Sequence, residues 1–95
     1  MERGNGEALI KCKVSLGMFS SEREVIVELP DGRMVAALVD KRHVEVAQDP
    51  APGEKVEGRL KVFVVETRKE SAIIDLPQPT IVEGLRFEIP RSFLI

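Results

Sequence analysis

The sequence predicts an all-β fold: a small antiparallel barrel or sandwich of five to seven strands, with at most one short helix. Three observations lead to this prediction. Apolar and polar residues alternate with period two in several segments, as they do in strands that bury one face. Glycine and proline stand between these segments, and no stretch of ten or more residues shows helical periodicity.

Size and composition indicate one domain. The chain has 95 residues, of which 43% are apolar and 32% are charged, and this suits a single globular core. We therefore predict one β domain over residues 1–95, in which residues 1–7 are disordered and residues 47–55 form an internal loop. The net charge of -2 excludes a positive electrostatic field over the whole domain, but it is compatible with a local basic patch. No apolar run has the length of a membrane span or signal peptide, so we expect a cytoplasmic protein without membrane contact.

The first predicted strand covers residues 8–18. Its apolar stripe is expected to face the core and consists of Ala8, Ile10, Cys12, Val14, Leu16 and Met18. Cys12 falls on this buried face, where a free thiol acts as a small hydrophobic group. We therefore expect it to react with thiol reagents only after unfolding.

A hairpin is predicted around Asp31-Gly32, between apolar runs at residues 24–29 and 33–39. A two-residue loop would place Leu29 opposite Met34 and bring six apolar side chains to one face: Val25, Val27, Leu29, Met34, Ala36 and Leu38. A three-residue loop with Pro30 at its first position is the alternative. Residues 40–43 are expected to form a bulge or tight turn, after which the alternation resumes at Val44 and Val46.

The next predicted hairpin pairs residues 56–66 with residues 72–76. Its alternation changes phase near Phe63, so that Phe63, Val65, Ala72, Ile74 and Leu76 are expected to share one face. A bulge, a covering segment or a second chain would account for this apolar face. From it we predict a partner-binding set that consists of Phe63, Val65, Ile74 and Leu76. A last strand over residues 85–89 and the apolar residues 93–95 are expected to dock on the same domain and cover this face.

The core is predicted to contain Ile10, Cys12, Val14, Val25, Val27, Leu38, Leu60 and Val62. Two basic turns are predicted to form an anion-binding rim if they meet at one end of the barrel: Lys41, Arg42 and His43 in the first, Arg68 and Lys69 in the second. His43 has no carboxylate or hydroxyl partner in its turn, so we do not assign it a catalytic role.

Residues 53–62, from Gly53 through Gly58 to Val62, superficially resemble the opening strand of OB-type RNA-binding barrels. A glycine where a barrel strand bends has a structural explanation of its own. The resemblance implies a base-stacking aromatic, and on this strand only Phe63 is available beside Lys61.

The sequence contains no nucleophile signature, no Gly-rich phosphate loop and no Cys and His set for zinc. We therefore expect no enzyme activity, no cofactor and no metal. The predicted function is a non-catalytic interaction module that binds a protein partner or itself, through the hairpin at residues 60–76 or a sheet edge. The alternative is an OB-like barrel that binds nucleic acid through Lys11, Lys13, Arg59, Lys61, Arg68 and Lys69.

Overall fold

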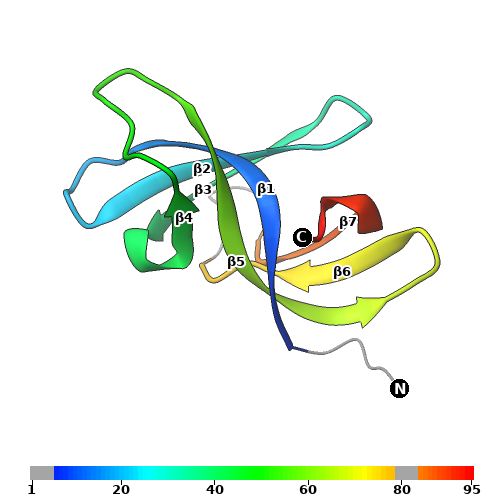
Figure 1. The fold of residues 1–95 in the computed structure, drawn as a ribbon. Coiled ribbons are helices and arrows are strands. Elements are labelled where there is room, and N and C mark those ends of the chain that lie inside the picture. The colour runs from blue at the N-terminus through cyan, green and yellow to red at the C-terminus, as the bar shows by residue number, and fades with distance from the viewer. Residues whose placement is uncertain (1–5, 79–83) are drawn as a thin grey trace.

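The computed structural model describes residues 6–78 and 84–95. They form seven antiparallel strands in one strongly curled sheet, a half-barrel, together with two short 3-10 turns (Figure 1). The strands are β1 (Gly6–Leu16), β2 (Glu22–Glu28), β3 (Met34–Asp40), β4 (Val44–Val46), β5 (Val56–Thr67), β6 (Ser71–Asp75) and β7 (Arg86–Pro90). The turns are η1 (Lys41–His43) and η2 (Arg91–Phe93). This confirms the predicted all-β class.

β5 is the central strand. On one side it pairs with β1 from Val56 to Val64, and on the other side it pairs first with β4 and then with β6. The order across the sheet is β3-β2-β1-β5-β6-β7, with β4 beside β5 off this path. Such a sheet has one concave face, and the core lies inside it.

The core consists of small and branched side chains. Its buried apolar members are Ile10, Cys12, Val14, Val25, Val27, Leu29, Val35, Ala37, Val39, Leu60, Val62, Val64, Ala72, Ile74, Leu76 and Ile89. Seven of the eight predicted core residues are among them, and Leu38 is only half-buried. Gly58 lies on this inner face, where an added Cβ would be 2.7 Å from Val14 Cγ2 and 2.8 Å from Val46 Cγ1. The glycine therefore allows β4 and β1 to pack closely over β5.

The β2–β3 register corrects the prediction made from a two-residue loop. The Gly32 N–H donates to the Leu29 carbonyl (3.0 Å) and the Leu29 N–H donates to the Arg33 carbonyl (2.8 Å), which leaves a three-residue loop led by Pro30. Gly32 takes the left-handed conformation that this loop needs, with φ of 92°. The odd loop moves the pairing by one residue, so Val35, Ala37 and Val39 enter the core. Met34, predicted on the same face as Val25 and Val27, is exposed, and Ala36 and Leu38 are half-buried on the outer face.

The predicted shared face of the β5–β6 hairpin is also wrong, and a bulge is the reason. Near the turn, Glu66 pairs with Ile73 as an even loop requires, but the register shifts between Val64 and Glu66. The extra residue is Val65, and beyond it Val64 pairs with Ile74 while Phe63 pairs with Asp75. Ile74 and Leu76 are therefore buried in the core, whereas Phe63 points outward.

The N-terminal end of the described chain differs from the prediction, whereas the C-terminal end agrees with it in part. β1 begins at Gly6, so residues 6 and 7 belong to the sheet, and residues 1–5 lie outside the described residues. β1 ends at Leu16, which leaves Leu16 and Met18 of the predicted stripe exposed. The residues after β7 dock on their own domain: Phe93 and Leu94 pack on the core, and Leu94 bridges to Ile10. They do not cover Phe63, which stays half-exposed.

Candidate functional site

The turn between β1 and β2 exposes two large apolar side chains. Met18 is 85% exposed and Phe19 is 67% exposed, the highest values among the large apolar residues that the structure describes. Leu16, at the end of β1, is 38% exposed. We call Met18 and Phe19 the apolar tip. Neighbouring large apolar side chains that stay in solvent are a candidate binding surface.

Backbone and side-chain hydrogen bonds hold the apolar tip in one conformation. The Gly17 N–H donates to the Glu22 carbonyl (3.1 Å), and the Glu22 N–H donates to the Phe19 carbonyl (3.0 Å). The Glu22 side chain folds back over Gly17, where an added Cβ would lie 2.9 Å from its Cγ atom. There its Oε1 atom accepts from the Met18 N–H (3.1 Å). The tip is therefore a closed turn rather than a loose loop.

Arg23 stabilises this turn through its guanidinium group. It is the one buried charged residue in the described part of the chain, with 6% of its surface exposed. Its Nη1 atom donates to the carbonyls of Ser20 (2.9 Å) and Glu22 (2.8 Å). Its Nη2 atom lies 3.4 Å from Asp49 Oδ2, in the loop that precedes β5. A buried guanidinium with these partners joins the tip to the 47–55 loop.

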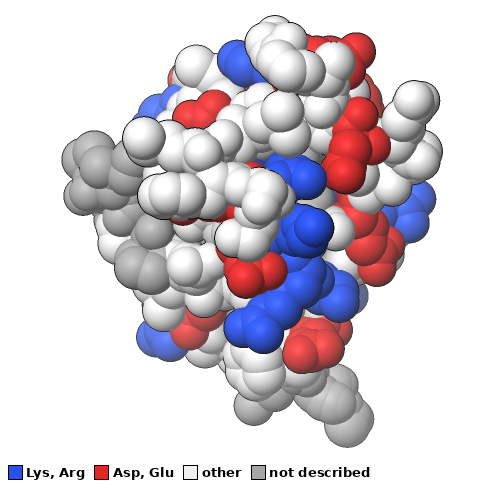
Figure 2. Space-filling model, turned by 90° about the vertical axis from the view of Figure 1, so that its left-hand side faces the viewer, with Lys and Arg blue, Asp and Glu red and all other residues white. Residues whose placement is uncertain are grey.

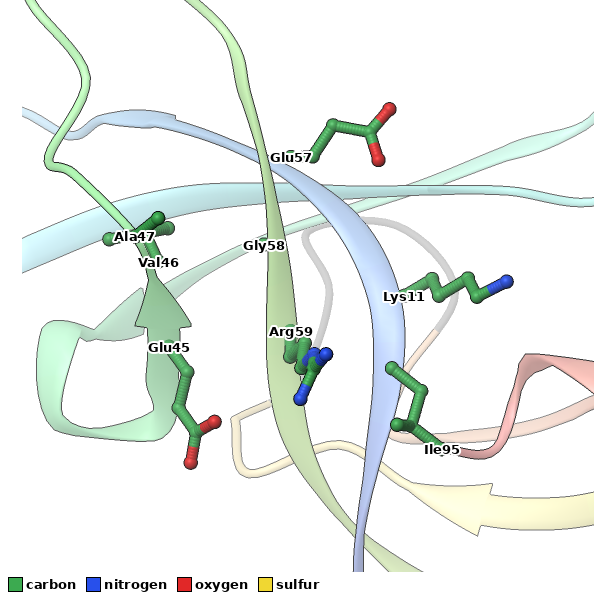
Figure 3. Close-up of a pocket in the computed structure, with 8 residues that line it drawn as sticks. All are labelled: Lys11, Glu45, Val46, Ala47, Glu57, Gly58, Arg59 and Ile95. Carbon is green, nitrogen blue, oxygen red and sulfur yellow. The ribbon is translucent and has the colours of Figure 1, made fainter.

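A second surface lies on the outer face of β4, β5 and β1. Lys11 on β1 stands directly opposite Arg59 on β5, and Glu45 on β4 stands opposite Arg59 on the other side. These side chains line a hollow of about 540 Å³, with Glu57, the backbone of Gly58 and Ile95 at its margins. Figure 3 shows Arg59 between Glu45 and Lys11. We call the outward-facing side chains of Lys11, Arg59 and Lys61 the basic row.

In the described part of the chain, no carboxylate forms an ion pair with the basic row. Within residues 6–78 and 84–95, no ion pair joins Lys11, Arg59 or Lys61 to an acidic group. By contrast, Lys13 Nζ lies 3.2 Å from Glu57 Oε2. Lys and Arg side chains form a continuous band on one side of the molecule, with Asp and Glu along its borders (Figure 2). The row is thus a group of neighbouring basic side chains that is open to an anionic ligand.

The row continues to Phe63. Arg59, Lys61 and Phe63 are alternate residues of β5 and are all exposed. A smaller hollow of about 160 Å³ beside Phe63 is lined in part by Lys61 and by His43 from η1. The structure therefore brings together one residue of the predicted anion rim, one predicted partner-binding residue and one lysine of the alternative nucleic-acid set.

The five residues of the predicted anion rim do not converge. η1 precedes Val44, which pairs with Leu60, whereas the turn with Arg68 and Lys69 follows Thr67 at the other end of β5. The eight residues from Leu60 to Thr67 span about 23 Å of strand. Figure 1 shows η1 and the β5–β6 turn on opposite sides of the molecule.

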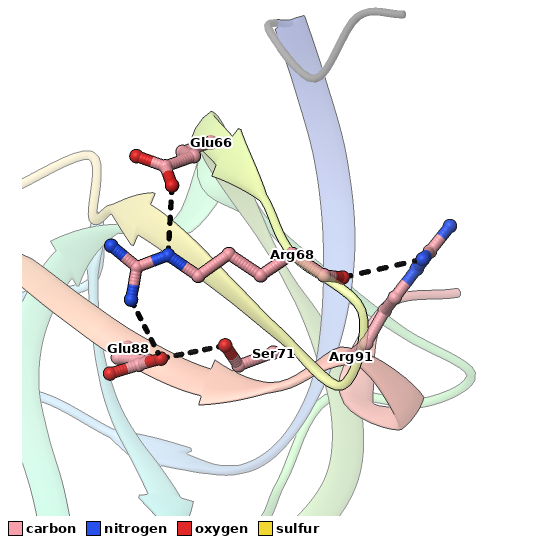
Figure 4. Close-up of polar contacts among 5 residues, drawn as sticks. All are labelled: Glu66, Arg68, Ser71, Glu88 and Arg91. Carbon is pink, nitrogen blue, oxygen red and sulfur yellow. Dashed lines mark hydrogen bonds and ion pairs between the residues drawn. The ribbon is translucent and has the colours of Figure 1, made fainter.

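Arg68 is engaged within its own end of the sheet (Figure 4). Its Nε atom donates to Glu66 Oε2 (2.8 Å) and its Nη1 atom donates to Glu88 Oε2 (3.3 Å), which also accepts from the Ser71 hydroxyl (2.6 Å). The hydrogen bond to Glu66 raises the pKa of Arg68 above its usual value. These contacts link the β5–β6 turn to β7. Arg68 therefore has a structural role.

The predicted partner-binding set is divided between the two faces of the sheet. Ile74 and Leu76 are buried, Val65 is half-buried at the bulge and Phe63 is half-exposed. Only Phe63 of this set offers a partner a large accessible surface. Cys12 is a free, buried thiol, and burial raises its pKa to about 12.

Two further observations concern the described residues alone. They contain no cluster of three or more His, Cys, Asp and Glu side chains that could hold a metal ion. They also contain no helix long and apolar enough to cross a bilayer.

Sequence reasoning missed the apolar tip. The period-two pattern continues from β1 to Met18, and so it placed Met18 in the core. The signal that could have found the tip is the composition of Gly17–Ser21, in which Met18 and Phe19 lie between a glycine and two serines. An apolar pair inside a turn composition is unusual, because turns are normally solvated.

No protein-family model matches the chain, and neither the curated proteins nor the solved structures contain a significant match.

Proposed function

We propose that this domain is a non-catalytic interaction module that binds a protein partner through the apolar tip. One observation carries the proposal: Met18 and Phe19 are held out in solvent by a turn whose hydrogen bonds and buried Arg23 leave little freedom. A preordered binding element loses less conformational entropy when it docks. The tip therefore has the properties of a docking element.

The two side chains suit this role chemically. Burial of a Met or Phe side chain contributes about 1.5 to 3 kcal/mol, and aromatic residues are common among those that dominate binding energy. Methionine adapts to pockets of irregular shape. Because the tip is small, the area that it can bury is well below that of a standard interface. We expect weak, reversible binding unless other surfaces of the domain also contact the partner.

The charged groups around the tip carry both signs. Glu22 and Asp49 lie beside it, and the backbone N–H of the exposed residue Lys41 donates to the Ser21 carbonyl at 2.8 Å. Anionic lipid surfaces attract clusters of exposed Lys and Arg beside an apolar anchor, whereas a mixed set of charges suits a protein partner.

The surroundings also favour a different protein over a second copy of this chain. The hollow of about 540 Å³ on the outer face of β4, β5 and β1 has Lys11, Arg59, Glu45 and Glu57 around it. An apolar tip placed there would remove charged groups from water without satisfying them. The partner is thus expected to present an apolar pocket.

The test is site-directed photo-cross-linking in cells that express the protein naturally. Benzoylphenylalanine at position 19 replaces one exposed aromatic group with another, and we expect it to form a cross-link with one discrete protein species. The matched control carries the same group at position 69, an exposed site in the β5–β6 turn, and should not capture that species. An excess of the unlabelled wild-type protein should suppress the cross-link, whereas an excess of the Met18→Ser, Phe19→Ser variant should not.

Three outcomes would contradict the proposal. The first is equal capture from positions 19 and 69, and the second is no capture from position 19. The third is a cross-link only to a second copy of the chain, accompanied by a solution mass that rises with concentration. This last result would identify the tip as a self-association site.

A further inference from the structure

We propose that the basic row and Phe63 together bind single-stranded nucleic acid, with phosphates on Lys11, Arg59 and Lys61 and a base against Phe63. This surface is separate from the apolar tip, and the inference does not depend on the function proposed for the tip. Its basis is the outer face of β1 and β5, where the four side chains lie on two paired strands.

Two like charges lie next to each other on this face. Lys11 and Arg59 are directly opposite in the β1–β5 pairing, and like charges in this position destabilise a sheet. Neither forms an ion pair within the described residues, although neighbouring Lys13 does so with Glu57. A phosphate in the hollow between them would accept hydrogen bonds from both and remove the repulsion.

The geometry of β5 extends this site in one direction. Arg59, Lys61 and Phe63 lie on the same face at alternate positions, so successive side chains are about 6.6 to 6.8 Å apart along the strand. This interval is comparable with that between successive phosphates of an extended single strand. Phe63 is 50% exposed, and an exposed ring is the group on which an unpaired base stacks. The hollow beside Phe63 leaves room at the ring for that base.

Acidic groups border the row and limit its affinity. Glu45 lies opposite Arg59, and Glu7 lies opposite Phe63. Glu57 is held by Lys13 at 3.2 Å. The domain as a whole carries a net charge of -2. We therefore expect dissociation constants of about 10⁻⁴ to 10⁻⁶ M at physiological salt, the range of sequence-independent binding.

The experiment is fluorescence anisotropy of a labelled twelve-nucleotide oligothymidylate, titrated with the full chain at 20 to 200 mM NaCl. Three phosphate contacts predict a slope of about -2 in the plot of log K against log salt. Lys11→Gln and Arg59→Gln should each weaken binding about three- to tenfold and make the slope shallower by about 0.7. Phe63→Leu should weaken binding about tenfold while the slope stays constant, because stacking releases no counterions. Glu45→Gln should tighten binding.

Lys69→Gln is the matched control, because it removes one exposed positive charge from the β5–β6 turn and should leave affinity unchanged. Two further measurements are the affinity for a duplex of the same length and the displacement of the oligonucleotide by inorganic phosphate at equal ionic strength. Binding that Lys69→Gln weakens as much as Lys11→Gln does would overturn the proposal, as would no binding at 20 mM NaCl. Equal affinity for the duplex would refute the stacking role of Phe63. Displacement of the oligonucleotide by millimolar phosphate would reduce the site to a simple anion site.

Discussion

At the scale of single residues, Arg23 connects the fold with the proposed binding site. Its guanidinium is buried and reaches the Ser20 carbonyl at 2.9 Å and Asp49 at 3.4 Å. Removal of this side chain takes a charged donor away from the part-buried Ser20 and Glu22 carbonyls, and a hydrogen bond to a charged group contributes about 1.5 to 3 kcal/mol.

We predict that Arg23→Met lowers the free energy of unfolding by about 1 to 3 kcal/mol. The variant should also make residues 17–21 susceptible to proteolysis in the native state, because the tip loses its anchor. Urea denaturation and limited proteolysis measure the two effects. Asp49→Asn is the control, since its ion pair involves a largely exposed carboxylate and should contribute at most about 1 kcal/mol. Equal stability of wild type and Arg23→Met would show that Arg23 is not an anchor.

Asp75 provides a pH-dependent contact between β6 and β7. Arg86 Nε and Nη2 donate to its two carboxylate oxygens at 2.8 and 3.0 Å, and the hydrogen bonds from Arg86 lower the pKa of Asp75. A carboxyl whose pKa is lower in the folded state stabilises the protein above its unfolded pKa. That contribution is lost as the pH falls through the folded pKa.

The stability of the wild type should therefore decline below about pH 4, where the unfolded chain begins to take up the Asp75 proton. Asp75→Asn should make this acid decline shallower and leave a smaller difference from wild type at pH 3 than at pH 7. Thermal unfolding between pH 3 and pH 7 compares the two proteins. Parallel curves throughout this range would mean that the Asp75–Arg86 contact does not contribute to stability.

At the scale of strands and turns, the packing of β4 against β5 depends on Gly58. An added Cβ at this position would lie 2.9 Å from the Glu45 carbonyl and even closer to Val14 and Val46. Gly58→Ala should therefore destabilise the domain by about 1 to 3 kcal/mol through overpacking. Val46→Ala should recover part of this loss in the double variant, which a thermodynamic cycle from urea denaturation can measure. Strictly additive effects would argue against the close approach.

The strands were predictable from the sequence, whereas the register of the hairpins was not. Alternation located the strand segments, and Asp31-Gly32 marked the β2–β3 turn. The Asp31-Gly32 dipeptide does not specify how many residues the turn contains. A change of one residue in the length of the turn decides whether Met34 or Val35 faces the core. The bulge at Val65 had the same effect on Phe63 and Ile74, because one unpaired residue reverses the faces of the strand beyond it.

The candidate sites were predictable only in part, for related reasons. Lys11, Arg59, Lys61 and Phe63 were all named, but the pairing that sets Lys11 beside Arg59 is a long-range contact that periodicity does not reveal. The apolar tip was missed because alternation continues past the last β1–β2 pair, Leu16 with Arg23. A pattern of apolar residues does not show where strand pairing ends.

At the scale of the whole molecule, the residues after β7 link the end of the chain with β1. Leu94 forms a bridge to Ile10, and the Ile95 N–H donates to the Leu9 carbonyl at 2.9 Å. Phe93 and Leu94 also pack on the core. This segment therefore covers a part of the edge of β1 that β2 does not reach.

Deletion of residues 91–95 should lower the free energy of unfolding by a few kcal/mol, which is the scale of losing partly buried Phe and Leu side chains. The exposed core and the uncovered β1 edge should promote association. Thermal unfolding and sedimentation test the two effects. A shortened protein that remains monomeric with an unchanged melting temperature would show that the segment is dispensable.

The molecule thus presents two separate surfaces, the apolar tip beyond β1 and the basic row on β1 and β5. The central claim is that the tip is preordered for docking, since its hydrogen bonds and Arg23 hold Met18 and Phe19 in place without a partner. Backbone ¹⁵N relaxation of the free protein tests this claim most directly. We predict order parameters of about 0.85 for residues 17–21, equal to those of the strands. Values below about 0.6 would contradict the account, because the tip would then be a flexible loop.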